Sequence, residues 1–312
     1  MDKNVKSGKI GNRLVSAAIA FVLLFSLLAL CSCQDSKTGY SLGLGVFLEE
    51  STEKLSVDTT AAAVVLDGDG KIVLCRVDRS RVSATVEGEK VISVGTDKTD
   101  YEQGKALSAG DGKYFYEGAN FFENYVKGKV LSDIEALERA DEGGTLDADF
   151  LAGCATDPTG FIRALKRAMI SERKATLAES DALTAGLGID ASVKGDGEGV
   201  AYVYGIGATA IIDGKVAASV IDAAEAEIVL EGGKGKEFIY AGTKLELGDG
   251  YGMVKNGGAS AEWYVQSANY AKTAKGKSAD GISSLPVENV SGCTMDARPL
   301  KDALLRAKEN IR

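Results

Sequence analysis

The sequence predicts an α+β protein built from two tandem copies of a small domain, placed after an N-terminal signal peptide. Three observations lead to this prediction: β-branched runs that flank Asp-Gly turns, apolar residues spaced for one face of a helix, and four segments that occur twice in the same order. The turns indicate β-hairpins, and the spacing indicates amphipathic helices. Each copy is therefore expected to combine an antiparallel sheet with two helices.

The first 33 residues have the composition of a secretory signal. Four basic residues precede an apolar run at 14–30, and the tetrapeptide "LCSC" closes the segment at Cys33. A basic region, an apolar run and a small-residue cleavage site are typical of such signals. The ending resembles a bacterial lipobox, which implies that residues 1–32 are a lipoprotein signal peptide and that Cys33 carries lipid. The alternative is an uncleaved membrane anchor, because the run approaches spanning length.

The composition excludes several classes of function. The chain has 312 residues, no histidine and a formal net charge of −9. Histidine-based catalytic triads and histidine metal sites are therefore excluded. Cleavage before Cys33 removes four basic residues and one acidic residue, which shifts the charge to −12. An acidic exported protein repels nucleic acid, so no nucleic-acid partner is expected. Cys75, Cys154 and Cys293 are far apart in the sequence, and we expect small buried apolar residues there.

Two glycine-rich segments are expected to be flexible. Residues 33–55 contain "QDSKTGYSLGLG", which is typical of a tether that holds a domain off a membrane. Residues 179–197 contain "ALTAGLGIDASVKGDG", which is expected to be a linker. These segments bound a first repeat domain at 56–178 and a second at 198–312.

Internal repetition defines the two copies. The matched segments, in chain order, are 64–78 with 211–222, 89–96 with 236–243, 113–137 with 262–285, and 152–168 with 291–307. Because their order is the same in both halves, they indicate one ancestral unit copied in tandem.

Each copy is expected to begin with strands and to end with a helix. Asp-Gly pairs at 69–70 and 213–214 mark the first hairpin turns, and a further strand follows at 91–94 and 238–241. The next helix of the first copy has a face formed by Phe115, Ala119, Phe122 and Val126, and its counterpart is expected to use Tyr264, Ala268 and Ala271. The last helices match Phe161, Leu165 and Ala168 with Leu300, Leu304 and Ala307. Pro299 stands in the first turn of the final helix, a favoured position for proline.

The loop before the last helix, "ENVSGCTMDARPL" at 288–300, is the main candidate for a functional site. It resembles the flavinylation motif of FMN-binding domains, such as the flavin subunits of Rnf and Na⁺-pumping NADH:quinone reductase complexes. In that motif an acidic residue precedes a Ser/Thr-Gly-Ala-Thr turn, and a separate transferase esterifies the last threonine to the phosphate of FMN. The stretch "DGKIV" at 69–73 also resembles the opening strands of such domains.

The resemblance implies a role for each residue of the loop. Glu288 takes the acidic position, where aspartate is usual, and Ser291 and Gly292 form the small pair. Cys293 stands in place of the usual alanine, and Thr294 is the acceptor for covalent FMN.

Physical reasoning supports a phosphate at this position. A helix N-terminus offers unpaired backbone N–H groups and the positive end of the dipole, and glycine allows close approach of the backbone. The alternative is that Ser291, Thr294 and Asp296 only cap the last helix.

The first copy differs at the acceptor. Ala155 aligns with Thr294, and Thr156 lies one residue further on. We expect the acceptor of the first copy to be lost, and Thr156 is kept as a second candidate position. In the second copy, the aromatic cluster of Tyr251, Met253, Trp263 and Tyr264 is expected to be core, with stacking on an isoalloxazine ring as the alternative.

Together these features predict an exported lipoprotein, anchored to the outer face of the cell membrane, that carries covalent FMN and shuttles electrons. Its layout is similar to that of lipoproteins with two such domains in Gram-positive extracellular electron transfer. The flavin would do the chemistry, so the chain would be an electron carrier rather than a self-contained enzyme. The implied partners are the lipid bilayer, a flavin transferase and redox proteins. The alternative is a flavin-free binding or structural surface lipoprotein with duplicated domains.

Overall fold

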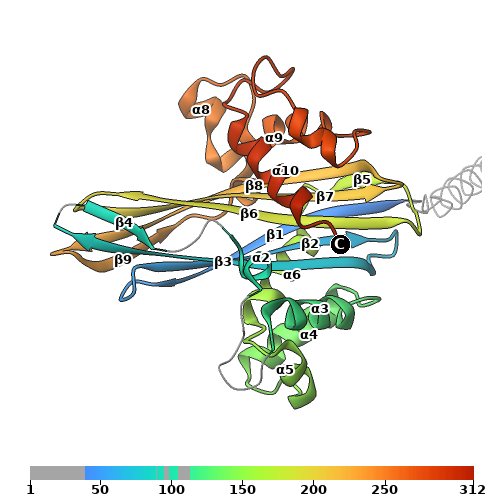
Figure 1. The fold of residues 1–312 in the computed structure, drawn as a ribbon, viewed down its shortest axis with the longest axis horizontal. Helices are drawn as coiled ribbons and strands as arrows, with labels where there is room; N and C mark the ends of the chain where they lie inside the picture. Colours follow the sequence, from blue (N-terminus) through green and yellow to red (C-terminus); the bar gives the residue numbers. More distant parts are fainter. Residues whose placement is uncertain (1–38, 89, 95–97, 105–112) are drawn as a thin grey trace, which may run out of the picture. The chain divides into compact units, whose positions relative to one another are not determined.

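Two antiparallel β-sheets, one from each half of the chain, form the centre of the fold (Figure 1). The computed structural model describes residues 39–88, 90–94, 98–104 and 113–312. The strand order is β4-β3-β2-β1-β5 in the first sheet and β6-β7-β8-β9 in the second. The strands are β1 (Tyr40–Ser51), β2 (Ser56–Leu66), β3 (Ile72–Glu87), β4 (Lys90–Val94), β5 (Ala175–Leu177), β6 (Leu183–Gly195), β7 (Gly199–Ile212), β8 (Lys215–Glu231) and β9 (Lys234–Tyr240).

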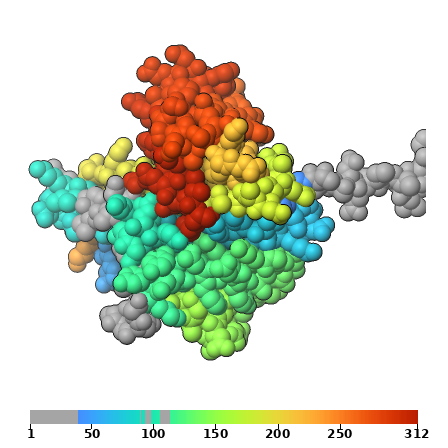
Figure 2. Space-filling view, turned by 45° about the vertical axis from the view of Figure 1, so that its right-hand side comes forward, coloured from blue at the N-terminus to red at the C-terminus, as the bar shows by residue number. Residues whose placement is uncertain are grey.

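Helices cover the outer faces of the two sheets. Helix α6 packs on β1 and β2, and α10 packs on β6 and β7. The two helical layers lie on opposite sides of the strands, one green and one orange to red (Figure 2). The helices are α2 (Asp100–Gln103), α3 (Phe115–Tyr125), α4 (Leu131–Glu142), α5 (Ala148–Cys154), α6 (Thr159–Ile170), α7 (Lys244–Leu247), α8 (Met253–Gly257), α9 (Trp263–Lys272) and α10 (Arg298–Glu309), with 3-10 turns η1 (Gly248–Tyr251) and η2 (Asp280–Ser284).

The inner faces of the two sheets share one hydrophobic core. Leu44 and Leu187, from equivalent strands, are both buried in it. Tyr204 on β7 donates a hydrogen bond across the sheets to the Val57 carbonyl at 3.1 Å, and Tyr202 donates to the Leu55 carbonyl. Residues 39–312 accordingly form one compact unit.

A second core lies on the outer face of the first sheet, beneath α3, α5 and α6. Its centre is a group of phenylalanines, with ring centroids 5.6 Å apart for Phe115 and Phe161 and 5.3 Å apart for Phe122 and Phe161. Aromatic pairs at these separations add to the stabilisation from burial alone. This core extends the first half well beyond its sheet.

The predicted hairpins are confirmed. An Asp-Gly pair connects β2 to β3 and another connects β7 to β8; in the second, Asp213 and Gly214 have φ of 50° and 73°, as a tight hairpin turn requires. After the first long helix in each half, a Lys-Gly-Lys turn returns to the start of the third strand. There, Gly128 donates to the Ile72 carbonyl and Gly276 to the Val216 carbonyl, both at 2.8 Å.

Three of the predicted helical faces are confirmed, and one is wrong. All the apolar residues expected on α3, α6 and α10 are buried, and Pro299 lies in the first turn of α10. On α9 the expected face included Tyr264 and Ala268, but Tyr264 is half-buried and Ala268 is exposed. Ala271 is buried as expected, and the other buried residues of this segment include Trp263, Ser267, Tyr270 and Ala274. These four residues have the same i, i+4, i+7, i+11 spacing as Phe115, Ala119, Phe122 and Val126. The buried face is shifted by one residue from the expected one, because Ser267 rather than Ala268 corresponds to Ala119.

The segment expected to be a tether contains a buried strand. Residues 40–51 form β1 in the middle of the first sheet. Gly43 and Gly45 alternate with Leu44 and Val46, so the glycines face α6 while the apolar side chains face the core. A Cβ atom at Gly45 would lie 2.2 Å from the Ala168 backbone nitrogen. Glycine here permits close helix packing rather than flexibility.

The segment expected to be a linker shows the same arrangement. Residues 183–195 form β6, and Cβ atoms at Gly186 and Gly188 would lie 1.9 and 2.3 Å from backbone atoms of Ala307 in α10. The alternation "GLG" in both strands is a period-two pattern with glycine on one face.

Besides the short α2, the first half also contains α4 and α5 beyond the two helices expected in each copy. Ile134 is the one buried residue of helix α4, so the hydrophobic pattern of this helix is weak. Helix α5 has seven residues and begins at a cap in which Asp147 accepts from the backbone N–H groups of Asp149 and Phe150. Neither provides enough periodicity to be recognised from the sequence.

Candidate functional site

The candidate loop connects η2 to α10 on the outer side of the second sheet. The predicted site residues Glu288, Ser291, Gly292 and Thr294 are all exposed. Cys293 is buried, and its backbone N–H donates to the Val290 carbonyl at 3.0 Å, which closes a tight turn. The loop thus presents the predicted acceptor to solvent while the residue before it anchors the loop in the core.

A buried glutamine on α9 holds Thr294 in place. Gln266 Oε1 accepts hydrogen bonds from Thr294 N at 2.8 Å, Thr294 Oγ1 at 3.1 Å and Met295 N at 3.1 Å. Its amide nitrogen donates to the Ala261 carbonyl at 2.8 Å, and the side chain is almost fully buried. A buried amide with all of these partners is strongly restrained. Sequence reasoning missed Gln266, since its importance depends on a contact 28 residues away.

Glycine is required at the tip of the loop. Gly292 has a φ of 72°, and a Cβ atom there would lie 2.6 Å from Asn269 Nδ2. This Asn269 nitrogen donates to the Gly292 carbonyl at 3.1 Å. A larger residue would therefore disturb both the backbone conformation and the contact with α9.

The expectation that Thr294 stands at the helix N-terminus is wrong. Helix α10 begins at Arg298, four residues later, and its first N–H donates to Asp296 Oδ1 at 3.0 Å. The next residue, Pro299, has no N–H to offer. Asp296 also pairs with the Arg298 side chain at 2.8 Å, and these hydrogen bonds lower the pKa of Asp296. Asp296 therefore fits the capping interpretation, whereas Thr294 binds Gln266 instead of capping the helix.

A cavity of about 460 Å³ lies beside the loop. Met295 and Asp296, the two residues that follow Thr294, contribute to its wall, together with Pro299 and Leu300 from α10. Three members of the predicted aromatic cluster line it as well, namely Tyr251, Met253 and Trp263. Trp263 is buried at the base of α9, while Tyr264 belongs to a different cavity.

The charge around this cavity is mixed. Its cations are Lys194 and Lys244, and its acidic residues are Asp190, Asp222, Glu225, Asp296 and Asp302. Lys244 is paired with Glu225 at 2.6 Å and lies 4.8 Å from the centre of the Tyr251 ring. The excess of carboxylates disfavours binding of a free anion in the cavity. A neutral ring system carries no charge for them to repel, so it can be bound there.

The equivalent place in the first half is filled by side chains. Ala155 ends α5 in a left-handed conformation, with a φ of 53°. The fourth residue of α3 is Gly118, whereas the fourth residue of α9 is Gln266, so α3 has no side-chain amide at this point. Phe121 packs over Gly153 and Phe150 instead. Thr156 is half-buried in this environment.

Each half also contains a buried aspartate that sequence reasoning missed. Asp78 on β3 accepts from Thr99 Oγ1 at 2.6 Å and from Tyr101 N at 3.2 Å. Asp222 on β8 accepts from Leu245 N at 3.0 Å and is also hydrogen-bonded by Thr243. Burial raises the pKa of each aspartate to about 7, despite these hydrogen bonds. A signal for them was present in the sequence, because Asp78 and Asp222 are the last residues of the matched segments 64–78 and 211–222.

The three cysteines are buried and free, as predicted. Burial raises the pKa of the thiols of Cys75, Cys154 and Cys293. A thiol that stays protonated is a poor nucleophile and a poor metal ligand. Within the described part of the chain, no group of three or more acidic or cysteine residues could hold a metal ion.

The residues around Thr294 fit covalent attachment of FMN, though not a preformed phosphate cradle. Thr294 is an exposed residue, the turn is small, and a cavity with aromatic walls lies alongside. The two N–H groups nearest the hydroxyl already donate to Gln266. Any phosphate would thus be held by its ester bond, with the ring placed by the cavity.

The expected signal peptide and Cys33 lie outside the described residues. Among the residues that are described, no helix is both long enough and apolar enough to cross a membrane.

No family model, curated protein or solved structure matches the chain.

Proposed function

We propose that this chain is an exported, lipid-anchored electron carrier that holds FMN covalently through a phosphoester at Thr294. The observation that carries the proposal is the position of Thr294, exposed at the tip of a restrained loop and directly beside the residues that wall a cavity of about 460 Å³. The flavin would supply the redox chemistry.

The residues around Thr294 would orient the cofactor. Gln266 fixes the backbone of the loop, and Gly292 keeps its tip free of a side chain. Trp263 and Tyr251 offer ring surfaces for a planar, largely apolar group. Because the phosphate would be esterified, its attachment does not depend on a cationic pocket, which agrees with the carboxylate-rich wall.

The proposal includes a tandem origin for the two halves. Supporting features occur at the same relative position in each: a "GLG" strand against the last helix, a Lys-Gly-Lys turn, and a buried aspartate hydrogen-bonded by a threonine. In this view one ancestral domain was copied, and the copies packed sheet to sheet. Only the second copy carries the acceptor, and the first serves as its packing partner.

Anchoring through Cys33 completes the proposal. Since β1 begins at Tyr40, only residues 34–39 lie between the lipid attachment point and the first sheet. The flavin domain would then be held close to the outer face of the cell membrane, within reach of a membrane dehydrogenase.

Co-production with an active flavin transferase tests the proposal. The wild-type chain should acquire a flavin absorption spectrum, Thr294→Ser should retain it in part, and Thr294→Ala should be colourless. We expect Thr294→Ala to fold like the wild type. Loss of one hydroxyl costs about 1 kcal/mol, whereas the total free energy of unfolding of a protein is typically about 5–15 kcal/mol. A colourless wild-type chain would favour the flavin-free binding lipoprotein.

A further inference from the structure

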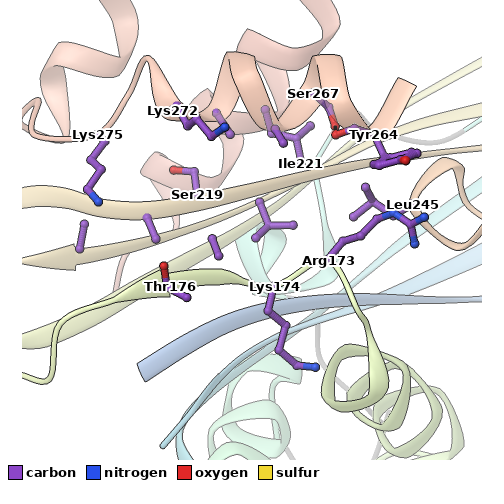
Figure 3. A pocket seen from close by; sticks show the side chains of 16 residues that line it. Arg173, Lys174, Thr176, Ser219, Ile221, Leu245, Tyr264, Ser267, Lys272 and Lys275 are labelled. Atoms are coloured by element: carbon purple, nitrogen blue, oxygen red, sulfur yellow. Dashed lines mark hydrogen bonds between the residues drawn. The ribbon is translucent and has the colours of Figure 1, made fainter. Parts of the chain in front are cut away.

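A second cavity, of about 290 Å³, lies between the strand β5, the strand β8 and the helix α9 (Figure 3). It is separate from the cavity beside Thr294, because the two sets of lining residues share only Ile221. Its walls are apolar where β8 and α9 face each other, as at Ala217 and Ala271.

Positive charge gathers around this second cavity. Arg173, Lys272 and Lys275 line it, and no acidic residue does. Lys174 also belongs to the lining, but its ammonium group points away toward α6 (Figure 3). The contrast with the carboxylate-rich cavity is notable in a chain whose net charge is −9.

Ion pairing with a carboxylate is absent at all three cations in the part of the chain that the structure describes. Among the described residues, none of the three forms an ion pair; Lys272 Nζ instead donates to Asn269 Oδ1 at 3.2 Å. Arg173 stacks on the Tyr264 ring at 4.2 Å, and its buried Nε has no hydrogen-bond acceptor. The like charges of Lys272 and Lys275, three residues apart at the end of α9, are unfavourable near each other, and an anion beside them would relieve this effect.

We propose that this cavity binds a small organic anion. Lys272 and Lys275 would hold its phosphate or carboxylate group, and the apolar wall at Ala217 and Ala271 would hold its carbon skeleton. Arg173 lies beside Tyr264, at the other end of the cavity (Figure 3). Thr176 adds a neutral hydroxyl to the same lining, whereas the Ser219 hydroxyl is hydrogen-bonded to Thr209 Oγ1 at 3.1 Å (Figure 3). The volume suits a ligand of one ring with one anionic substituent. This inference is independent of FMN at Thr294.

The lysines also have a structural role that the test must separate from ligand binding. Lys272 ends α9 and Lys275 lies in the next turn, where cations interact favourably with the negative end of the helix dipole. Removing either charge should therefore lower the melting temperature slightly even without a ligand. Only a loss of anion affinity is diagnostic.

The experiment is calorimetric titration of the full chain, purified in a non-ionic detergent, with phenyl phosphate, benzoate and neutral benzyl alcohol as probes. We expect at least one anion to bind, and to bind at least about tenfold more tightly than benzyl alcohol. Tighter binding of phenyl phosphate assigns the site to phosphates, and tighter binding of benzoate assigns it to carboxylates.

Three variants make the result specific to the cavity. Lys272→Gln and Lys275→Gln should each weaken anion binding about tenfold, and Ala268→Phe, at an exposed position in the wall, should block it without changing charge. Lys255→Gln is the matched control, because this exposed lysine on α8 lines neither cavity. Failure of both anions to bind, unchanged affinity in the cavity variants, or an equal loss in Lys255→Gln would each overturn the proposal.

Discussion

Gln266 Oε1 accepts hydrogen bonds from both the backbone nitrogen and the hydroxyl of Thr294, at 2.8 and 3.1 Å. The buried side chain of Gln266 on α9 thereby fixes the hydroxyl of Thr294, an exposed residue on the loop before α10. The arrangement keeps Thr294 accessible while it removes most of its freedom, which suits a residue that a second protein must modify. It also makes Gln266 the position whose replacement tests the loop most cleanly.

Replacing Gln266 with alanine should loosen the loop without removing the hydroxyl of Thr294. Three donors lose Gln266 Oε1 as their common hydrogen-bond acceptor, so we expect a loss of about 1–3 kcal/mol in the free energy of unfolding. Flavin content after co-production with the transferase should fall as well. Urea unfolding and flavin absorbance measure the two effects. Gln103→Ala, a half-buried glutamine on α2, is the control and should leave flavin content unchanged.

The buried aspartates predict an unusual dependence of stability on pH. The pKa of Asp78 and of Asp222 is about 7 in the folded chain, against 3.8 for an unperturbed aspartate. The folded state therefore holds a proton more tightly than the unfolded state does. The resulting stabilisation is complete below about pH 4 and is lost as the pH rises through about 7.

Asp78→Asn and Asp222→Asn test this dependence, because the amide keeps an acceptor oxygen but cannot ionise. The stability of each variant relative to wild type should rise between about pH 5 and about pH 8, by an amount on the order of a few kcal/mol. Chemical unfolding at the two pH values measures the change. A difference between variant and wild type that is the same at both pH values would show that the aspartates do not titrate in this range.

The glycine-bearing strands predict a sharp intolerance of small side chains. Gly45→Ala and Gly186→Ala would place a Cβ atom 2.2 Å from the Ala168 nitrogen and 1.9 Å from the Ala307 carbonyl oxygen. Each should destabilise the fold by about 1–3 kcal/mol or more, since helix and strand must separate. Thermal unfolding measures the effect. Gly250→Ala meets no atom within 4 Å and should be nearly neutral; an equal loss there would contradict the packing argument.

These glycines also show where sequence reasoning succeeded and where it failed. The Asp-Gly turns and the faces of α3, α6 and α10 could be predicted, because local turn chemistry and helical spacing determine them. Strands β1 and β6 could not, because the close approach of Ala168 and Ala307, which gives their glycines a role, is a tertiary contact. The same holds for the site: Thr294 is visible as a motif residue, whereas Gln266 and the cavity depend on how α9 packs.

Lipid anchoring through Cys33 is a further prediction, motivated by "LCSC" after the apolar run. Cys33→Ala should release the chain from membranes or stop its processing, because the acceptor for lipid is gone. Fractionation and intact mass measure both effects. Cys293→Ala, which removes a buried cysteine far from the signal, is the control and should remain anchored. Normal processing and anchoring of Cys33→Ala would exclude the lipoprotein assignment.

The most direct test of covalent flavin at Thr294 is peptide mass mapping of the protein purified from its native host. We expect one modified peptide, containing Thr294, heavier than its sequence mass by one FMN less one water, and an unmodified peptide containing Thr156. A flavin on the Thr156 peptide, or an unmodified Thr294 peptide from cells with an active transferase, would contradict this expectation.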